Sequence, residues 1–317
     1  MSTSPSAVIG RLPRLLFAIV LSVMAVGLFA APPARLASAQ TTIDCSSFPA
    51  PASSPAAGSP APTAATVATP APTAAFPADS GRLTVFAAAS LTNAFDDIGA
   101  TLEADNPGLD ITFNYAGSQA LVTQLTEGAE ADVFASANTT QMTKAEDAGV
   151  ITGEPATFAG NRLGLVVPTD NPAGIASLAD LANDDVSVVL AQQDVPVGQY
   201  ARQALCTAGQ DTATYGDGFV DAVAGNVVSE EEDVRDVLTR IQLGEADAGI
   251  VYVSDYVATE GGGVTLIDIP DTVNAIASYP IAAVAGGEAD LAAAFIGYVL
   301  GPDGQAVLEE YGFQPAA

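Results

Sequence analysis

Residues 83–95 read LTVFAAASLTNAF, and this stretch decides the fold. Its first part, up to Ala89, is an uncharged and almost wholly apolar run, which is typical of a strand buried on both faces of a sheet. From Ser90 onward the apolar residues recur at helical spacing, at Leu91, Ala94 and Phe95. A buried strand that passes directly into a helix is the first unit of an α/β fold, and Ser90 stands at the junction.

The same alternation continues along the chain. Strand-like and helical segments follow one another in two series, DITFNYA, SQALVTQLTEG, ADVFASA and TQMTKAEDAG, then NRLGLVVP, DVSVVLA, QYARQALCTAG, EDVRDVLTRIQLGEA and AGIVYV. Such alternation predicts mostly parallel sheets flanked by helices. We therefore expect an α/β protein of two lobes, with lobe 1 formed by residues 82–165 plus 278–317 and lobe 2 by residues 166–277. In this division the C-terminal helical segments return to the first lobe.

The N-terminal residues 1–39 carry the pattern of a signal peptide. Arg11 and Arg14 precede 17 uncharged residues, Leu15–Ala31, and the following ARLASAQ places alanines at 37 and 39, which fits a small-residue cleavage site. The alternative is an uncleaved anchor, because 17 residues lie at the lower limit of a membrane span. Both interpretations put the folded part outside the cytoplasm, in the periplasm or at the cell surface.

Residues 40–81 are expected to form a disordered spacer. Between positions 49 and 77 they contain 8 prolines and 11 alanines and no charge, a composition that cannot build a core. Two cysteines in an exported chain, Cys45 and Cys206, can form one disulfide that pins this tail to the folded body. A free Cys206 packed at a helix end is the alternative.

The charge balance excludes several classes of function. Without residues 1–39 the chain holds 6 basic and 37 acidic residues, a formal charge of −31, so nucleic acid is excluded as a partner and a soluble monomer is expected. The absence of histidine removes a Ser-His-Asp triad and every imidazole ligand. Lys144 is the only lysine, and the acidic run SEEEDV at 229–234 is interpreted as a helix start. No enzyme and no resident cofactor are expected.

Two serines follow the first two predicted strands. Ser90 ends the first strand and Ser118 follows FNYAG, where Gly117 allows a sharp turn. Either serine can cap the helix that begins there, and capping is the ordinary role of such a residue. Both junctions, however, fall at the carboxyl edge of one parallel sheet, where open α/β sheets bind their ligands.

The second series of elements offers matching positions. In VPVGQY, Val197 lies between Pro196 and Gly198, so its amide is left free at a helix start. Asp233 is expected to cap the next helix, leaving the Val234 amide in its first turn. Tyr252 ends a strand and can present its hydroxyl. The alternatives are packing roles for the two valines and an amphipathic strand end for the tyrosine.

Six motifs together resemble a known family. The motifs are VFAAASLTNAF, ADVFASAN, PVGQYARQAL, EDVRDVL, GIVYVSD and GPDGQAVLEEYGF. In order and spacing they are similar to those of the extracytoplasmic molybdate-binding proteins of ABC importers, and the resemblance runs from about Arg82 to Phe313. The resemblance implies a type II periplasmic-binding fold, two α/β lobes joined by two crossing strands, that closes on one tetrahedral oxyanion. The family's alanine in the proline-glycine turn is replaced by Val197, and the proline-rich spacer lies outside the family domain.

The resemblance also implies a ligand and its contacts. Molybdate, together with tungstate, is expected to bind through the hydroxyls and amides of Ser90 and Ser118, the amides of Val197 and Val234, and the hydroxyl of Tyr252. Molybdenum is held only as the oxyanion, and the partner is the permease of an ABC importer. The alternatives are a binding protein for sulfate or another tetrahedral oxyanion, an enzyme on the same fold, and a passive surface protein tethered by residues 15–31.

Overall fold

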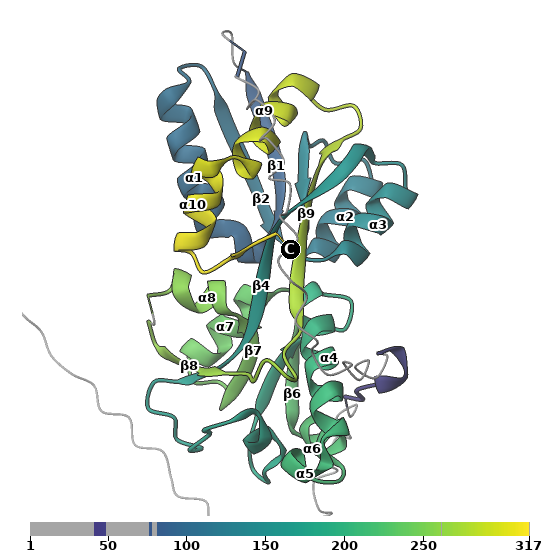
Figure 1. The fold of residues 1–317 in the computed structure, drawn as a ribbon, viewed down its shortest axis with the longest axis vertical. Helices are drawn as coiled ribbons and strands as arrows, with labels where there is room; N and C mark the ends of the chain where they lie inside the picture. Colours follow the sequence, from purple (N-terminus) through teal and green to yellow (C-terminus); the bar gives the residue numbers. More distant parts are fainter. Residues whose placement is uncertain (1–40, 49–75, 78–80, 261, 317) are drawn as a thin grey trace, which may run out of the picture. The chain divides into compact units, whose positions relative to one another are not determined.

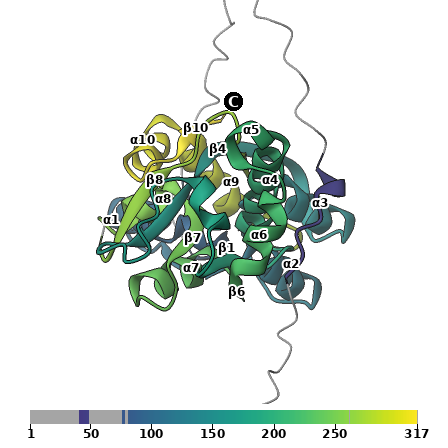
Figure 2. The same cartoon turned by 90° about the horizontal axis from the view of Figure 1, so that it is seen from below.

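The computed structural model describes residues 41–48, 76–77, 81–260 and 262–316. The predicted signal peptide and most of the predicted spacer lie outside these residues. Figures 1 and 2 show the described part as a mixed sheet with helices on both faces. The strand order in this part is β2-β1-β3-β9-β4-β7-β5-β6, with β8 and β10 also pairing with β4. The α/β class expected from the alternating segments is therefore confirmed.

One half of the sheet is built from the first strands of the chain. β1 (Arg82–Ala88) lies between β2 (Asp110–Ala116) and β3 (Val133–Ala135) and runs parallel to both. The side chains of β1 from Val85 to Ala88 are all buried, as its continuous apolar sequence predicts. We call this half, with the helices that cover it, lobe 1.

Two long strands connect lobe 1 to the rest of the sheet. β4 (Ile151–Pro168) and β9 (Ile276–Val284) pair antiparallel, from Ile151 opposite Val284 to Arg162 opposite Ile276. Beyond that point β4 pairs with β7 and β8, whereas the other end of β9 pairs with β3. These are the two crossing strands of the type II fold, and β4 and β9 can be followed through both halves in Figure 1.

The other half of the sheet, lobe 2, contains β5 (Val188–Ala191), β6 (Val227–Glu231), β7 (Ala248–Tyr252) and β8 (Val264–Asp268). The interpretation of residues 229–234 as a helix start was wrong for Ser229–Glu231. These residues form the end of edge strand β6, where Arg202 pairs with Glu230 and Arg240 with Glu231. Because these arginines lie on other elements, the local sequence did not reveal that the acidic run could pair in a strand.

The helices cover both faces of the sheet. Their bounds are α1 (Thr92–Asp105), α2 (Ser118–Thr126), α3 (Thr139–Asp147), α4 (Pro196–Gln210), α5 (Thr212–Tyr215), α6 (Phe219–Asn226), α7 (Val234–Gln242), α8 (Val253–Ala258), α9 (Ala289–Leu300) and α10 (Pro302–Glu310), with the 3-10 turns η1 (Cys45–Ser47), η2 (Ala89–Leu91) and η3 (Leu178–Ala182). In lobe 1, α1, α9 and α10 lie on the face opposite α2 and α3 (Figures 1 and 2). In lobe 2, α7 and α8 lie opposite α4 and α6.

The C-terminal segment packs against elements of lobe 1. Phe295 of α9 packs edge-on against Phe95 of α1, with ring centroids 5.6 Å apart, and β10 (Gln314–Pro315) pairs with Ala159 and Gly160 of β4. Within the described residues no single helix is long and apolar enough to cross a membrane, although the bent pair α9 and α10 together meets the length and composition of such a span.

The N-terminal turn η1 is joined to lobe 2. A disulfide links Cys45 to Cys206 of α4, with the two Cα atoms 5.5 Å apart. Of the two alternatives drawn from the cysteine count, the structure contains the disulfide. It attaches the first part of the 40–81 segment to lobe 2. The prediction of a disordered spacer was wrong for Cys45–Ser47, because the disulfide holds these residues in a 3-10 turn.

Candidate functional site

A small pocket lies where the two lobes meet, and it brings all five predicted ligand residues together. It is lined by Ala88, Ala89, Ser90, Ala116, Gly117, Ser118 and Ala137 of lobe 1 and by Val195, Pro196, Val197, Asp233, Val234 and Tyr252 of lobe 2. Its cavity volume is about 10 Å³. That is about the space of one water molecule, so the pocket suits a single small ion rather than a sugar or a peptide.

Ser90 does not cap a helix. It lies in η2 between β1 and α1 and is 3% exposed, and the N-cap residue of α1 is Leu91, which makes no side-chain capping bond. The Ser90 Oγ instead lies 2.9 Å from the hydroxyl oxygen of Tyr279 on β9. The ordinary capping role is therefore wrong for this serine.

Ser118 likewise serves no capping role with its side chain. It is the first residue of α2, after the N-cap Gly117, and its Oγ accepts a hydrogen bond of 3.0 Å from the Ala137 N–H. Gly117 is needed here, because a Cβ would lie 2.5 Å from the Glu232 carbonyl oxygen of lobe 2. The turn before Ser118 is thus a point of close approach between the lobes.

The start of α4 presents the Val197 amide. Pro196 is the first helical residue, as expected, and Val197 is 1% exposed in the pocket wall. An amide in the first turn has no partner within the helix. A Cβ on Gly198 would lie only 2.0 Å from the Gln192 carbonyl oxygen, so this glycine allows α4 to begin directly against the end of β5.

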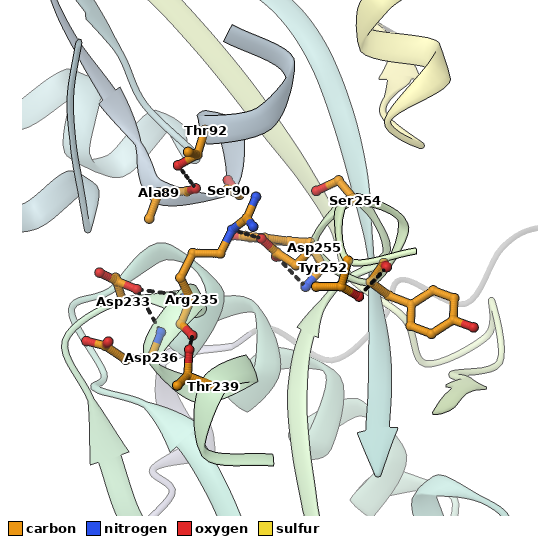
Figure 3. Close-up of polar contacts among 12 residues, drawn as sticks. Ala89, Ser90, Thr92, Asp233, Arg235, Asp236, Thr239, Tyr252, Ser254 and Asp255 are labelled. Atoms are coloured by element: carbon orange, nitrogen blue, oxygen red, sulfur yellow. Dashed lines mark hydrogen bonds and ion pairs between the residues drawn. The ribbon is translucent and has the colours of Figure 1, made fainter. Parts of the chain in front are cut away.

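The start of α7 presents the Val234 amide. The predicted cap is confirmed, since the Asp233 carboxylate accepts from the amides of Arg235 at 2.7 Å and Asp236 at 3.0 Å (Figure 3). These two bonds use one carboxylate oxygen and leave the amide of Val234, the first helical residue, outside the cap. Figure 3 shows this helix start facing Ala89 and Ser90 of η2.

Tyr252 contributes a buried hydroxyl from the end of β7. The side chain is 1% exposed, and within the described residues its hydroxyl oxygen has no hydrogen-bond partner. Burial, followed by the nearby Tyr279, raises the pKa of Tyr252 well above its usual value, so the hydroxyl keeps its proton. A buried and unpaired O–H is the strongest sign in this pocket of a group that awaits a ligand.

Asp255 forms an ion pair beside the pocket with the partly exposed Arg235, which the sequence did not reveal. Asp255 is fully buried; one carboxylate oxygen lies 3.0 Å from Arg235 Nε and the other accepts a 3.2 Å bond from the Tyr252 N–H (Figure 3). Burial raises the pKa of Asp255 to about 6, and the charge of Arg235 opposes that rise. The pair joins the end of β7 to the start of α7, and so fixes two of the predicted donors relative to one another.

Three further residues lie behind Ser90. Asn161 of β4 donates from Nδ2 to Ser254 Oγ at 2.7 Å and to the Tyr279 hydroxyl at 3.4 Å. Sequence reasoning missed these residues because Asn161 and Tyr279 occupy the middle of long apolar strands. Only the antiparallel pairing of β4 with β9 brings them together.

The pocket is built for an anion without a cation. No lysine or arginine is among its lining residues, and the described part of the chain holds no group of three or more acidic or cysteine side chains able to bind a metal ion. The polar groups are neutral N–H and O–H donors at helix starts, which carry partial positive charge. Asp233 is the exception, and two amides neutralise part of its charge.

Comparison with known proteins identifies relatives of the chain. The model of the family described as bacterial extracellular solute-binding protein matches residues 83–314. The molybdate-binding protein ModA of Mycobacterium tuberculosis strain H37Rv is 41% identical over 234 residues, 73% of this chain and 84% of the relative. ModA of Escherichia coli K12 is 34% identical over 244 residues, 74% and 90% of the two chains.

A solved structure shares the fold. The sulfate-binding protein SubI of Mycobacterium tuberculosis H37Rv superposes with a TM-score of 0.67 at 20% identity, covering 74% of this chain and 87% of that one. At this identity the likeness concerns the fold alone. The chain therefore belongs to the family of bacterial extracellular solute-binding proteins that contains the molybdate-binding protein ModA.

Proposed function

We propose that the chain captures molybdate in the pocket between its lobes and delivers it to the permease of an ABC importer. One observation carries the proposal: Ser90, Ser118, Val197, Val234 and Tyr252 all line one small pocket that contains no basic side chain. The 41% identity to ModA supports molybdate as the ligand. The family consists of substrate-binding proteins, so the chain is not an enzyme and carries no cofactor.

The donors can hold a dianion without a formal positive charge. Each N–H or O–H that meets the oxyanion makes a charge-assisted hydrogen bond of about 1.5 to 3 kcal/mol. The starts of α2, α4 and α7 each add up to about 1 kcal/mol through their partial positive charge. The acidic surface, with a formal charge of −28 for the whole chain, is screened beyond about 8 to 10 Å at physiological salt.

Binding couples to movement of the lobes. Ser90 and Ser118 belong to lobe 1 and the other three donors to lobe 2, so a bound oxyanion favours the closed arrangement. Because the free space is about that of one water molecule, the lobes must part to admit a tetrahedral oxyanion. We place the lobe boundaries at 82–165 plus 278–317 and 166–277, and the closed form is the state that the permease recognises.

Tungstate and sulfate share the tetrahedral shape and the double charge of molybdate. Tungstate is expected to bind with molybdate, since the donors contact only the oxygens. Sulfate is smaller, so its oxygens lie farther from the donors of the pocket wall, and discrimination depends on the size of the closed pocket. The fold does not distinguish these ligands, as the likeness to SubI illustrates.

Calorimetry on the exported protein, freed of bound anion by dialysis under mild denaturation, tests the proposal. Molybdate and tungstate are expected to release heat with 1:1 stoichiometry. Heat with sulfate and none with molybdate would replace the proposal by the sulfate alternative. Elemental analysis of the protein as purified identifies the oxyanion that accompanies it.

The location of the protein is tested separately. The relatives are extracellular solute-binding proteins, and we propose that residues 1–39 are a cleaved signal peptide and that the exported protein is monomeric. The intact mass of the exported protein distinguishes cleavage after Ala39 from a retained anchor. Small-angle scattering reports the oligomeric state, and ligand-dependent closure in the same experiment separates a transport protein from a passive surface protein.

A further inference from the structure

A buried chain of hydrogen bonds runs behind the pocket, through both crossing strands. It links Ser90 Oγ to the Tyr279 hydroxyl at 2.9 Å, the Tyr279 hydroxyl to Asn161 Nδ2 at 3.4 Å, and Asn161 Nδ2 to Ser254 Oγ at 2.7 Å. All four residues are at least 97% buried. Its members come from both lobes and from β4 and β9, but only Ser90 reaches the pocket.

The direction of these hydrogen bonds follows from the residue types. The Asn161 Oδ1 accepts from the Arg162 N–H at 2.9 Å, which orients the amide and turns its NH₂ group toward Tyr279 and Ser254. An amide NH₂ can only donate. The Tyr279 oxygen therefore accepts from Asn161. Either hydroxyl could donate in the bond between Tyr279 and Ser90, but among the described residues Ser90 Oγ is the one acceptor in reach of the Tyr279 hydrogen, so we take Tyr279 as the donor. Burial raises the pKa of Tyr279, which keeps that hydrogen in place.

Ser90 is thus an acceptor toward the protein. With its oxygen occupied by Tyr279, its own hydrogen is the group directed at the pocket. Ser118 is arranged in the same sense, because its Oγ accepts from the Ala137 N–H. At Ser118 the hydrogen-bond donor is a backbone amide, so no side-chain substitution can remove it. At Ser90 the direction of the hydrogen bond depends on the Tyr279 hydroxyl alone.

We propose that Tyr279, oriented by Asn161, is a positioning residue that fixes Ser90 as a hydrogen-bond donor toward the pocket and so favours oxyanions that only accept hydrogen bonds. This inference rests on the proposed function. Molybdate at neutral pH has four acceptor oxygens and no hydrogen. Hydrogen phosphate carries an O–H that needs an acceptor. A serine free to rotate can turn a lone pair toward it, whereas a serine whose hydrogen is held toward the pocket presents a donor there instead.

Tyr279→Phe tests the proposal. It removes the hydroxyl and keeps the ring, whose centroid lies 5.4 to 6.1 Å from those of Phe313, Tyr252 and Phe158. We expect molybdate affinity to fall about threefold to tenfold, and the ratio of hydrogen phosphate to molybdate dissociation constants to narrow by about tenfold. Tyr215→Phe, on α5 and outside the pocket, is the matched control and should change neither value.

A double-mutant cycle separates positioning from packing. In a Ser90→Ala background, Tyr279→Phe should change neither affinity nor selectivity further, because Tyr279 acts through the serine hydrogen. An equal loss for both anions with unchanged selectivity, or a further loss in the Ser90→Ala background, would overturn the proposal. Melting temperatures verify folding. If Tyr279→Phe fails to fold, Asn161→Leu, which removes the orienting NH₂ group, should narrow the selectivity in the same direction, and unchanged selectivity there overturns the proposal.

The experiments distinguish a failure of the proposed function from a failure of the inference about Tyr279. If the wild-type protein binds no molybdate, the proposed function fails and the inference fails with it. If wild-type binding is normal and Tyr279→Phe matches it for both anions, only the inference about Tyr279 fails.

Discussion

Tyr252 shows at the scale of one residue how the pocket differs from a packed core. A buried hydroxyl without a hydrogen-bond partner costs stability, and a structure retains such a group where it has a use. Ser118 follows the same logic, because its Oγ accepts from the Ala137 N–H and its hydrogen stays available. The site is therefore specified by which atoms remain unpaired.

Tyr252→Phe is expected to separate binding from stability. The variant loses one charge-assisted bond to the oxyanion, so molybdate affinity should fall about tenfold to a hundredfold. The ligand-free protein should be as stable as the wild type or up to about 1 kcal/mol more stable, because an unsatisfied hydroxyl is removed. Calorimetry and denaturant unfolding measure the two effects. A variant that loses stability together with affinity would show that the hydroxyl serves the fold.

Sequence reasoning recovered the pocket residues better than it recovered what supports them. Ser90, Ser118, Val197, Val234 and Tyr252 lie at junctions between elements, and such junctions are visible in the sequence as changes of pattern. Asn161 and Tyr279 lie inside strands, where nothing in the local sequence marks them. Arg235 and Asp255 lie in the first turns of α7 and α8, but nothing in the local sequence shows that they pair with each other. Their roles follow from strand pairing and helix packing between segments 20 to 189 residues apart.

At the scale of the elements, the first turns of helices contribute most of the proposed donors. Gly198 determines how closely one of these turns approaches the sheet. At Gly198 a Cβ would lie 2.0 Å from the Gln192 carbonyl oxygen and 2.5 Å from that of Ala191. Neither neighbour is a flexible side chain. The first turn of α4, with the Val197 amide, can therefore sit against β5 only while position 198 has no side chain.

Gly198→Ala should thus displace the start of α4. We expect a loss of about 1 to 3 kcal/mol in stability from the overlap and a weaker molybdate affinity from the displaced Val197 amide. Gly225→Ala in α6 is the matched control, because no atom lies within 4 Å of its added Cβ. That variant should gain up to about 1 kcal/mol from helix propensity. Equal stabilities of the two variants would contradict the steric argument.

The junction of α7 and β7 is held by Asp255, and its raised pKa makes a prediction about pH. The folded-state pKa of about 6 exceeds the ordinary aspartate value of about 3.9, so between these values the folded protein holds a proton that the unfolded chain has lost. The contribution of Asp255 to stability is therefore greatest below about pH 4 and declines as the pH rises through 6.

Asp255→Asn removes this pH dependence and retains an acceptor for the Tyr252 N–H. Denaturant unfolding of both proteins from pH 4 to pH 7 should show the stability advantage of the wild type falling by up to about 3 kcal/mol over that range. All other carboxyl groups are common to both proteins, so the difference isolates Asp255. Parallel profiles would mean that Arg235 holds the pKa of Asp255 near its ordinary value.

At the scale of the whole molecule, the two lobes are hydrogen-bonded to one another outside the pocket. Gln119 donates to the Glu232 carbonyl oxygen at 2.7 Å, Asn138 to Gln199 Oε1 at 2.8 Å, and Gln141 to the Asp194 carbonyl oxygen at 2.7 Å. Each donor is a neutral amide of lobe 1, and each acceptor lies beside the start of α4 or α7. The sequence predicts two lobes but not these bonds, which exist only because the lobes meet.

These bonds stabilise closure independently of the oxyanion, and Gln119→Ala tests that role. Gln119 is partly exposed and lies outside the pocket lining, so its truncation removes one bond between the lobes and leaves every proposed donor in place. A net hydrogen bond of about 0.5 to 1.5 kcal/mol corresponds to a twofold to tenfold loss of molybdate affinity, because the affinity includes the free energy of closing.

The loss should appear as faster dissociation, and small-angle scattering of the ligand-free variant should show a larger radius of gyration than that of the wild type. Gln203→Ala on α4, whose side chain is exposed, is the control and should leave both unchanged. Gln119→Ala could weaken molybdate binding and leave the radius of gyration of the ligand-free protein unchanged. That result would mean that the substitution acts on the oxyanion contacts of the neighbouring Ser118, and not on the equilibrium between open and closed lobes.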